Sequence, residues 1–180
     1  MKVLFILMIL ALAFQVFPVA LGMNYRELKV KIFSFSFILI LGQLLMFQAG
    51  YLLGEKFLYL VESFKGTVIF IGFALIGFRL IMESFRVRKG ERTYVLEHPG
   101  TVALASFAQA IDTFLAGMLF TLFSIANRLL LIVLFLSVTA VIFIGVLMKP
   151  DKTAGALSSL LFLLGGIVML FTALFFGFFV

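Results

Sequence analysis

The sequence contains no cysteine and no tryptophan, and charged residues make up only 12% of its 180 positions. Without cysteine, the chain has neither a disulfide framework nor a thiolate metal site. Without tryptophan, any aromatic anchors at a membrane surface must be tyrosine or phenylalanine. Soluble domains carry about twice this share of charge. The scarcity of charge therefore argues against a soluble fold.

Hydrophobic residues take the place of the missing charged ones. They account for 64% of the chain, and the mean hydropathy is +1.29. The apolar runs are each about 20 residues long, the length of a membrane-crossing helix, and they lack the alternation of barrel strands. We therefore expect an all-α membrane protein with the lipid bilayer as its surroundings.

Short polar breaks divide the chain into six predicted transmembrane helices. Their expected bounds are 3–23, 32–54, 66–84, 101–122, 129–148 and 154–178. The first has an alternative interpretation as a cleaved signal peptide, because a basic start and an apolar run are followed by small residues. The internal repeat described below argues against that alternative.

Basic residues are distributed unevenly between the two sides of the predicted spans, nine against four. The first, third and fifth loops carry Arg26, Lys29, Lys31, Arg86, Arg88, Lys89, Arg92, Lys149 and Lys152. The other side carries Lys2, Lys56, Lys65 and Arg128. Because basic loops stay in the cytoplasm, we expect a multi-pass protein of the plasma (inner) membrane with both termini outside. The net charge of +6 then reflects topology, and no nucleic-acid partner is expected.

The two halves of the chain resemble each other. "AFQVF" at 13–17 matches "AIDTF" at 110–114, and "GTVIFIGFALIGFRLI" at 66–81 matches "GALSSLLFLLGGIVML" at 155–170. Each half holds three spans, an odd number, so the second copy must enter the membrane from the opposite side. This is the inverted-repeat plan of secondary transporters, with a substrate site near the midplane.

These matches predict three parts of the chain. Residues 1–84 form a first three-helix repeat, 85–100 a basic cytoplasmic loop, and 101–180 a second three-helix repeat. The repeat also makes the first span the partner of the fourth, a role that a cleaved signal could not fill.

Asp112 lies in the middle of the fourth span, about eleven residues from its start. A carboxylate at that depth costs about 3 kcal/mol and usually faces the bundle interior or a water-filled path. Protonation or pairing with a cation would lower this cost. An ion site is the functional interpretation, and a helix-end aspartate bonded to a neighbouring hydroxyl is the structural one.

Three further polar positions are candidate ligands. Gln15 is the repeat mate of Asp112, and Gln43 lies in the second span. Either amide could supply an oxygen ligand or simply join two helices by a hydrogen bond. Glu83 stands four residues after Arg79 on one helical face, so it is either the partner of Arg79 in a salt bridge or a second acidic ligand.

The sequence contains no Gly-rich phosphate loop, no HExxH, no pair of membrane aspartates typical of a protease, and no GxSxG serine with a histidine partner. We therefore do not expect an enzyme, and no resident cofactor is predicted.

The chain resembles the six-helix manganese efflux pumps of the MntP type, relatives of the lysine-exporter superfamily. Three motifs carry the resemblance. They are Gly42, Gln43, Met46, Gly50 and Tyr51 in the second span; Gly77, Arg79, Glu83, Phe85 and Arg86 in the third; and Asp112 with Gly117 in the fourth. Two positions depart from the family pattern, because Gln15 replaces an aspartate of the first span and Phe47 replaces a proline.

The resemblance implies a secondary-active exporter of Mn²⁺, with protons as a candidate coupling ion. The implied metal ligands are Asp112, Glu83, Gln15 and Gln43, since Mn²⁺ prefers oxygen ligands and carboxylates offset its charge. Protonation of Asp112 from the outer side would release the ion. Two alternatives stay open: an exporter of another small solute such as an amino acid, and a non-transporting membrane scaffold whose site has decayed.

Overall fold

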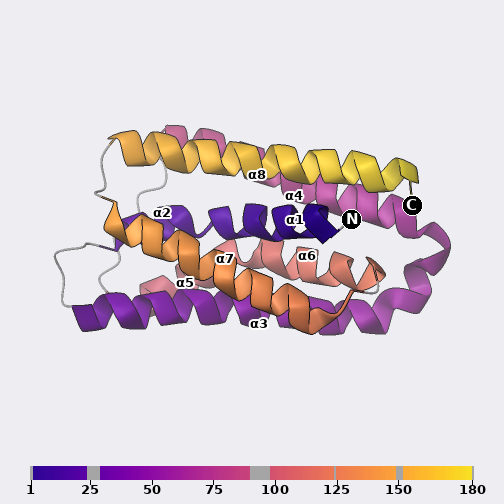
Figure 1. Cartoon of the computed structure of the whole chain (residues 1–180), viewed down its shortest axis with the longest axis horizontal. Helices are drawn as coiled ribbons and strands as arrows, with labels where there is room; N and C mark the ends of the chain where they lie inside the picture. The colour runs from indigo at the N-terminus through magenta and orange to yellow at the C-terminus, as the bar shows by residue number, and fades with distance from the viewer. Residues whose placement is uncertain (1, 24–28, 90–97, 124, 149–151, 180) are drawn as a thin grey trace.

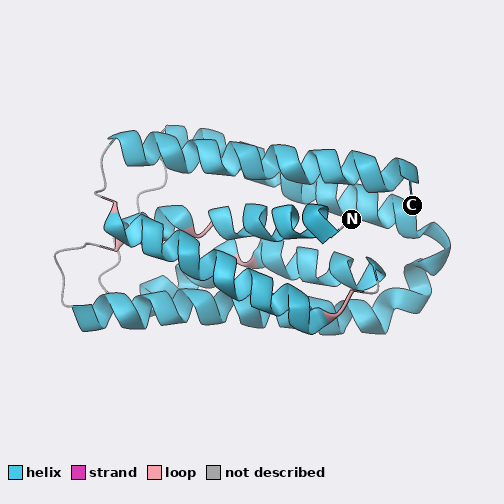
Figure 2. Ribbon diagram, in the orientation of Figure 1, coloured by secondary structure: helices cyan, strands magenta, loops and turns pink. Residues whose placement is uncertain are grey.

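The computed structural model describes residues 2–23, 29–89, 98–123, 125–148 and 152–179. Within these ranges the chain is helical apart from short links, and no strand is present (Figure 2). The expected all-α class is therefore confirmed. Four helical segments are long and apolar enough to cross a membrane, or five if one bent pair counts as a single span.

The six predicted spans all correspond to helices, and two of them are interrupted. The first span consists of α1 (Lys2–Phe14) and α2 (Phe17–Gly22), and the fourth of α5 (Pro99–Gln109) and α6 (Ile111–Phe120), followed by the short helix η2 (Thr121–Phe123). The second and third are α3 (Lys29–Val61) and α4 (Lys65–Arg88), joined by η1 (Glu62–Phe64). The fifth and sixth are α7 (Asn127–Leu147) and α8 (Lys152–Phe179).

The helices form an elongated bundle along one common direction (Figure 1). The apolar stretch Lys31–Arg88 covers 58 residues because α3, η1 and α4 follow one another without a coil. Figure 1 shows that the chain reverses direction at η1, so α3 and α4 run in opposite directions. The beginning of α1 and the end of α8 lie at the same end of the bundle.

The helix bounds differ from the predicted ones mainly at the turns. The helix α3 continues to Val61 and α4 to Arg88, each several residues beyond the predicted span. Half of the basic loop predicted at 85–100 lies outside the described residues, which end at residue 89 and begin again at residue 98.

The first span is interrupted because of Pro18. This residue lies in the first turn of α2 and has no backbone N–H to donate to the carbonyl of Phe14. The backbone instead makes tighter bonds: the N–H of Gln15 reaches the Leu12 carbonyl at 3.4 Å, and that of Val16 the Ala13 carbonyl at 3.1 Å. The helix therefore ends just before Gln15 and resumes after Val16.

The fourth span bends by 42° between α5 and α6. Ala110 is the joint, and the helical bonds on its two sides remain, from the N–H of Ala110 to the Ser106 carbonyl and from that of Phe114 to the Ala110 carbonyl. Figure 2 shows both interruptions as short links near the middle of the bundle.

The contacts between helices show how the six spans pack. The most extensive contact joins α4 to α8; α3 packs along α5 and α6; and α7 packs along α1 and α2. Glycine permits the closest approach on α3, since a Cβ at Gly50 would lie about 2.0 Å from the Phe114 carbonyl oxygen and one at Gly54 2.6 Å from that of Met118. Gly50 and Gly54, which are spaced as a GxxxG motif, thus mark the contact of α3 with α6.

A cluster of phenylalanines fills the core toward the end of the bundle where α1 begins. The rings of Phe5 and Phe176 stack at 5.6 Å, and those of Phe123 and Phe176 lie 4.6 Å apart. Phe120 contacts both Phe5 and Phe73. This apolar core ties α1, α4, α6, η2 and α8 together and leaves the polar side chains to the middle of the bundle.

Candidate functional site

The polar centre of the bundle lies where the two interrupted spans face each other. Gln15 follows the last residue of α1, and Asp112 and Thr113 lie in the first turn of α6. Gln43 reaches the same place from α3. All four side chains are buried, with Gln43 and Thr113 fully inaccessible and Asp112 only 3% exposed. A site built from them is closed to solvent in this conformation.

Thr113 is the hub that joins the two amides. Its Oγ1 accepts a hydrogen bond from Gln15 Nε2 at 3.1 Å and donates one to Gln43 Oε1 at 2.5 Å. One hydroxyl thereby joins α6 to the link between α1 and α2 and to α3, through residues that lie 98 and 70 positions away from Thr113 in the sequence. Gln43 Nε2 is buried and makes no hydrogen bond among the described residues. The amide of Gln43 is therefore only half satisfied in this arrangement.

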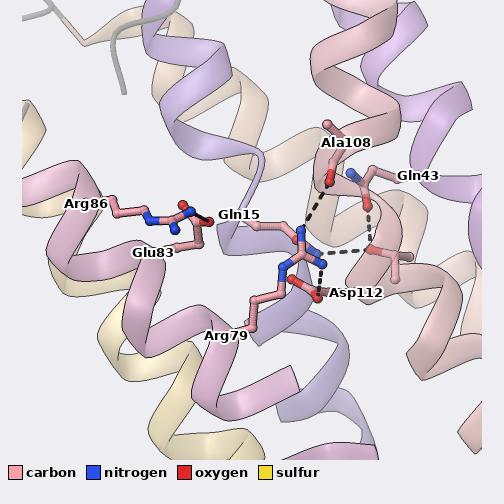
Figure 3. Close-up of polar contacts among 8 residues, drawn as sticks. Gln15, Gln43, Arg79, Glu83, Arg86, Ala108 and Asp112 are labelled. Carbon is pink, nitrogen blue, oxygen red and sulfur yellow. Dashed lines mark hydrogen bonds and ion pairs between the residues drawn. The ribbon is translucent and has the colours of Figure 1, made fainter. Parts of the chain in front are cut away.

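Asp112 forms an ion pair with Arg79 of α4. Arg79 Nη1 lies 2.7 Å from Asp112 Oδ1, and Nη2 donates to the Ala108 carbonyl at 3.4 Å (Figure 3). Ala108 belongs to the last turn of α5, where backbone carbonyls lose their helical donors and favour a cation. The guanidinium thus sits against both a carboxylate and the negative end of a helix.

Glu83 has a different partner. Arg86 Nη1 lies 3.3 Å from Glu83 Oε1, and Figure 3 shows Glu83 turned toward Arg86 while Arg79 points toward Asp112. The interpretation of Arg79 and Glu83 as a salt bridge is therefore not the arrangement found. The helical spacing of four residues allowed that pair, but the carboxylate of Asp112 in another helix takes the guanidinium instead.

Three of the four predicted ligands therefore come together, namely Gln15, Gln43 and Asp112, and Glu83 stands apart with Arg86. Among the described residues, no group of three or more acidic or histidine side chains gathers to hold a metal. Any cation site in this region must draw on amide, hydroxyl or backbone oxygens in addition to Asp112.

The sequence alone does not predict the roles of Thr113, which joins the two amides, and of Arg79, which pairs with Asp112. Thr113 directly follows Asp112 in the sequence. A hydroxyl next to a carboxylate predicted to be buried is the one sequence signal that points to Thr113 as part of the site. For Arg79 the sequence offers a candidate partner only within its own helix, namely Glu83. Its actual partner lies 33 residues away, a relationship that helical spacing does not contain.

Comparison with known proteins places the chain in a family. Residues 26–176 match the family described as "Putative manganese efflux pump". A protein of Bacteroides thetaiotaomicron named "Putative manganese efflux pump MntP" is 30% identical over 104 residues, which is 58% of this chain and 52% of that protein. The match thus spans about half the length of this relative. No solved structure was found to match.

The family match begins after α1 and α2, so Gln15 lies outside it and Gln43, Arg79, Glu83 and Asp112 lie within it. The description of the family is that of a transporter rather than of an enzyme. With residues 26–176 matched out of 180, the chain belongs to the family of manganese efflux pumps of the MntP type.

Proposed function

We propose that this chain is a secondary-active transporter that exports a divalent cation, with Mn²⁺ as its substrate. The observation that carries the proposal is the buried carboxylate of Asp112 placed beside two amides at the point where two interrupted helices meet. Interrupted helices at mid-bundle are a common way for transporters to expose ligand oxygens inside the membrane. A carboxylate buried among apolar membrane helices is costly, and residues of this kind commonly mark ion pathways.

The proposed ligands are Asp112 and the side-chain oxygens of Gln15 and Gln43. Glu83, the fourth predicted ligand, is paired with Arg86 outside this group. Mn²⁺ favours oxygen donors, and Asp112 offsets part of its charge. In the observed conformation Arg79 forms an ion pair with Asp112, and Thr113 is hydrogen-bonded to the side-chain amides of Gln15 and Gln43. Ion binding therefore requires these contacts to rearrange.

The proposed architecture is a pair of inverted three-helix repeats, 1–84 and 101–180, that cross the plasma (inner) membrane six times with both termini outside. The helix contacts support it. In an inverted repeat, each contact between two spans should recur between their repeat mates. The first span packs against the fifth, and their mates, the fourth and the second, also pack together. The first span packs against the sixth, and their mates, the fourth and the third, do the same. The interruptions of the first and fourth spans also fall within the matching segments 13–17 and 110–114.

The proposed mechanism is alternating access, in which the two repeats rock around the central site. Protonation of Asp112 from the outer side would neutralise the carboxylate, release the ion and reset the carrier. Export should then depend on external pH, and a flux independent of external pH would contradict the coupling.

The test is intracellular manganese, measured by elemental analysis in a bacterial strain that lacks its own exporter. Cells carry the native chain, Asp112→Asn, Glu62→Gln or empty vector at equal expression. Glu62 is an exposed carboxylate of η1 and provides the charge-matched control. We expect the native chain and Glu62→Gln to lower manganese and Asp112→Asn to remain at the vector level. A native chain that leaves manganese unchanged would remove Mn²⁺ as the substrate.

A second candidate function follows from the ion pair. Arg79 and Asp112 present a positive and a negative group side by side, which would suit the carboxylate and the amino group of a zwitterion such as an amino acid. The half-satisfied amide of Gln43 adds a hydrogen-bond donor nearby. Amino acids that compete with the transport signal, in place of divalent cations, would identify this function. A scaffold without transport would show no flux in the native chain and no change of flux on substitution of either Asp112 or Glu83.

A further inference from the structure

The strongest unexplained feature of the central site is that a side chain of the protein already occupies it. The Asp112 side chain, only 4% exposed, contacts the Arg79 guanidinium at 2.7 Å. A divalent cation at Asp112 would therefore meet a positive charge within contact distance. Like charges this close repel strongly in a site away from water. The ion and Arg79 cannot share the carboxylate.

We propose that Arg79 is a tethered counter-ion, which neutralises Asp112 when the site is empty and moves to Glu83 when a divalent cation binds. This inference rests on the proposed export function. It assigns Arg79 the role of a positioning residue that sets the affinity of the site and expels the ion at the end of each transport cycle.

The surroundings of Arg79 suit a movable group. Its side chain is 36% exposed, whereas that of Asp112 is 4% exposed, so the guanidinium reaches the carboxylate from a more open region. It contacts Asp112 through Nη1 and the Ala108 carbonyl through Nη2 at 3.4 Å. The guanidinium thus divides its two N–H donors between two acceptors. A bidentate ion pair with a single carboxylate would be stronger.

Glu83 is placed to receive the displaced guanidinium. It lies four residues after Arg79 on the same face of α4, a spacing at which side chains of a helix meet. Its side chain is 7% exposed, and its ion pair with Arg86 is long, at 3.3 Å. Arg86 is itself 55% exposed and can turn to solvent. Buried charge would then stay balanced throughout the cycle, since Arg79 always faces one carboxylate.

The test is a titration of the purified full chain in detergent with Mn²⁺ alone, monitored by the EPR signal of unbound Mn²⁺. The variants are Arg79→Gln, Glu83→Gln and the double variant. Arg88→Gln is the matched control, because Arg88 is an exposed arginine near the end of the same helix. Arg79→Met is a second uncharged replacement for use if Arg79→Gln does not elute as a single folded species.

We expect Arg79→Gln to bind Mn²⁺ at least about fivefold more tightly than the native chain, the lower end of typical couplings between sites, and to export it more slowly. Arg88→Gln should match the native affinity. Glu83→Gln should weaken binding in the native background, because Arg79 then has no second partner, and should have no effect in the Arg79→Gln background. This lack of additivity distinguishes a receiving carboxylate from a direct ligand.

Three results would overturn the inference, and they are distinguishable. If Arg79→Gln binds no more tightly than Arg88→Gln, the export function stands and the counter-ion role fails. If Glu83→Gln weakens binding equally in both backgrounds, Glu83 is a ligand and does not receive Arg79. If no form binds Mn²⁺, including Arg79→Gln, the proposed function fails and this inference with it.

Discussion

Gly77 of α4 and Gly166 of α8 face each other across the closest approach of these two helices. A Cβ added to Gly77 would lie 2.9 Å from the Gly166 carbonyl oxygen, and one added to Gly166 would lie 2.8 Å from that of Gly77. The two residues are also repeat mates in the sequence. A contact between equivalent residues is what a two-fold axis through that point would produce, so it supports the proposed inverted repeat.

We expect Gly166→Ala to destabilise the bundle by about 1–3 kcal/mol, because the added methyl group overpacks a contact made by backbone atoms on both sides. Thermal unfolding of the purified protein measures the effect. Gly155→Ala on the same helix is the control, since a Cβ there meets nothing within 4 Å. That change should leave stability unchanged or raise it through helix propensity. Equal unfolding temperatures for the two variants would contradict the close contact.

The number, order and approximate bounds of the helices could be predicted because each apolar run has the length of a membrane-crossing helix. The interruptions were missed for different reasons. Pro18 was a readable signal in the first span, since proline cannot donate the helical hydrogen bond. The bend at Ala110 has no such signal.

The candidate site was predictable only in part. Depth within a span singled out Asp112, and the repeat singled out Gln15. Which side chains touch depends on the register between helices, and a single sequence carries little information about that. The spacing within α4 offers Glu83, four residues away, as one candidate partner of Arg79, and the actual partner is Asp112 on α6. The spacing of residues within one helix does not show whether a side chain pairs with a residue of its own helix or with one on a neighbouring helix.

The hydroxyl of Thr113 should contribute to stability in its own right. Thr113→Val keeps the shape of the side chain but leaves Gln15 Nε2 and Gln43 Oε1 without their shared partner. We expect a loss of about 1–2 kcal/mol, the size of interhelical hydrogen bonds in model membrane helices, measured by thermal unfolding.

Thr172→Val is the control for this change. Thr172 is equally buried, but its hydroxyl donates to the Val168 carbonyl 2.7 Å away within α8, and it bonds to no second helix among the described residues. Its replacement should cost less than that of Thr113. If both substitutions cost the same, the hub at Thr113 does not hold the three helices together.

The absence of cysteine makes the orientation directly testable. Glu62 of η1 and His98 at the start of α5 are both exposed and are predicted to lie on opposite sides of the membrane. In intact cells, a thiol reagent that cannot cross the membrane should label Glu62→Cys and spare His98→Cys. Lysed cells should show labelling of both, which controls for reactivity. The reverse pattern in intact cells would place both termini in the cytoplasm.

Restoring a carboxylate at position 15 is the sharpest test of the central site. Gln15→Asp would place a second negative charge beside Asp112, with Arg79 as the nearby cation. Without metal we expect a lower unfolding temperature, because two buried carboxylates repel. With Mn²⁺ we expect binding at least about tenfold tighter than in the native chain, equivalent to about 1.4 kcal/mol. Ligand binding to the folded state then stabilises this variant more than the native protein.

The control is Gln48→Asp, which makes the same substitution on α3 where the side chain accepts a hydrogen bond from Asn127 at 2.9 Å. Gln48→Asp should lose stability and gain no response to Mn²⁺. A Mn²⁺ response shared by both variants would mean that any added carboxylate binds the ion. A response confined to Gln15→Asp would instead show that the interruption of the first span still positions a metal ligand. Glutamine at that position then tunes the charge of the site, and the geometry around it is retained.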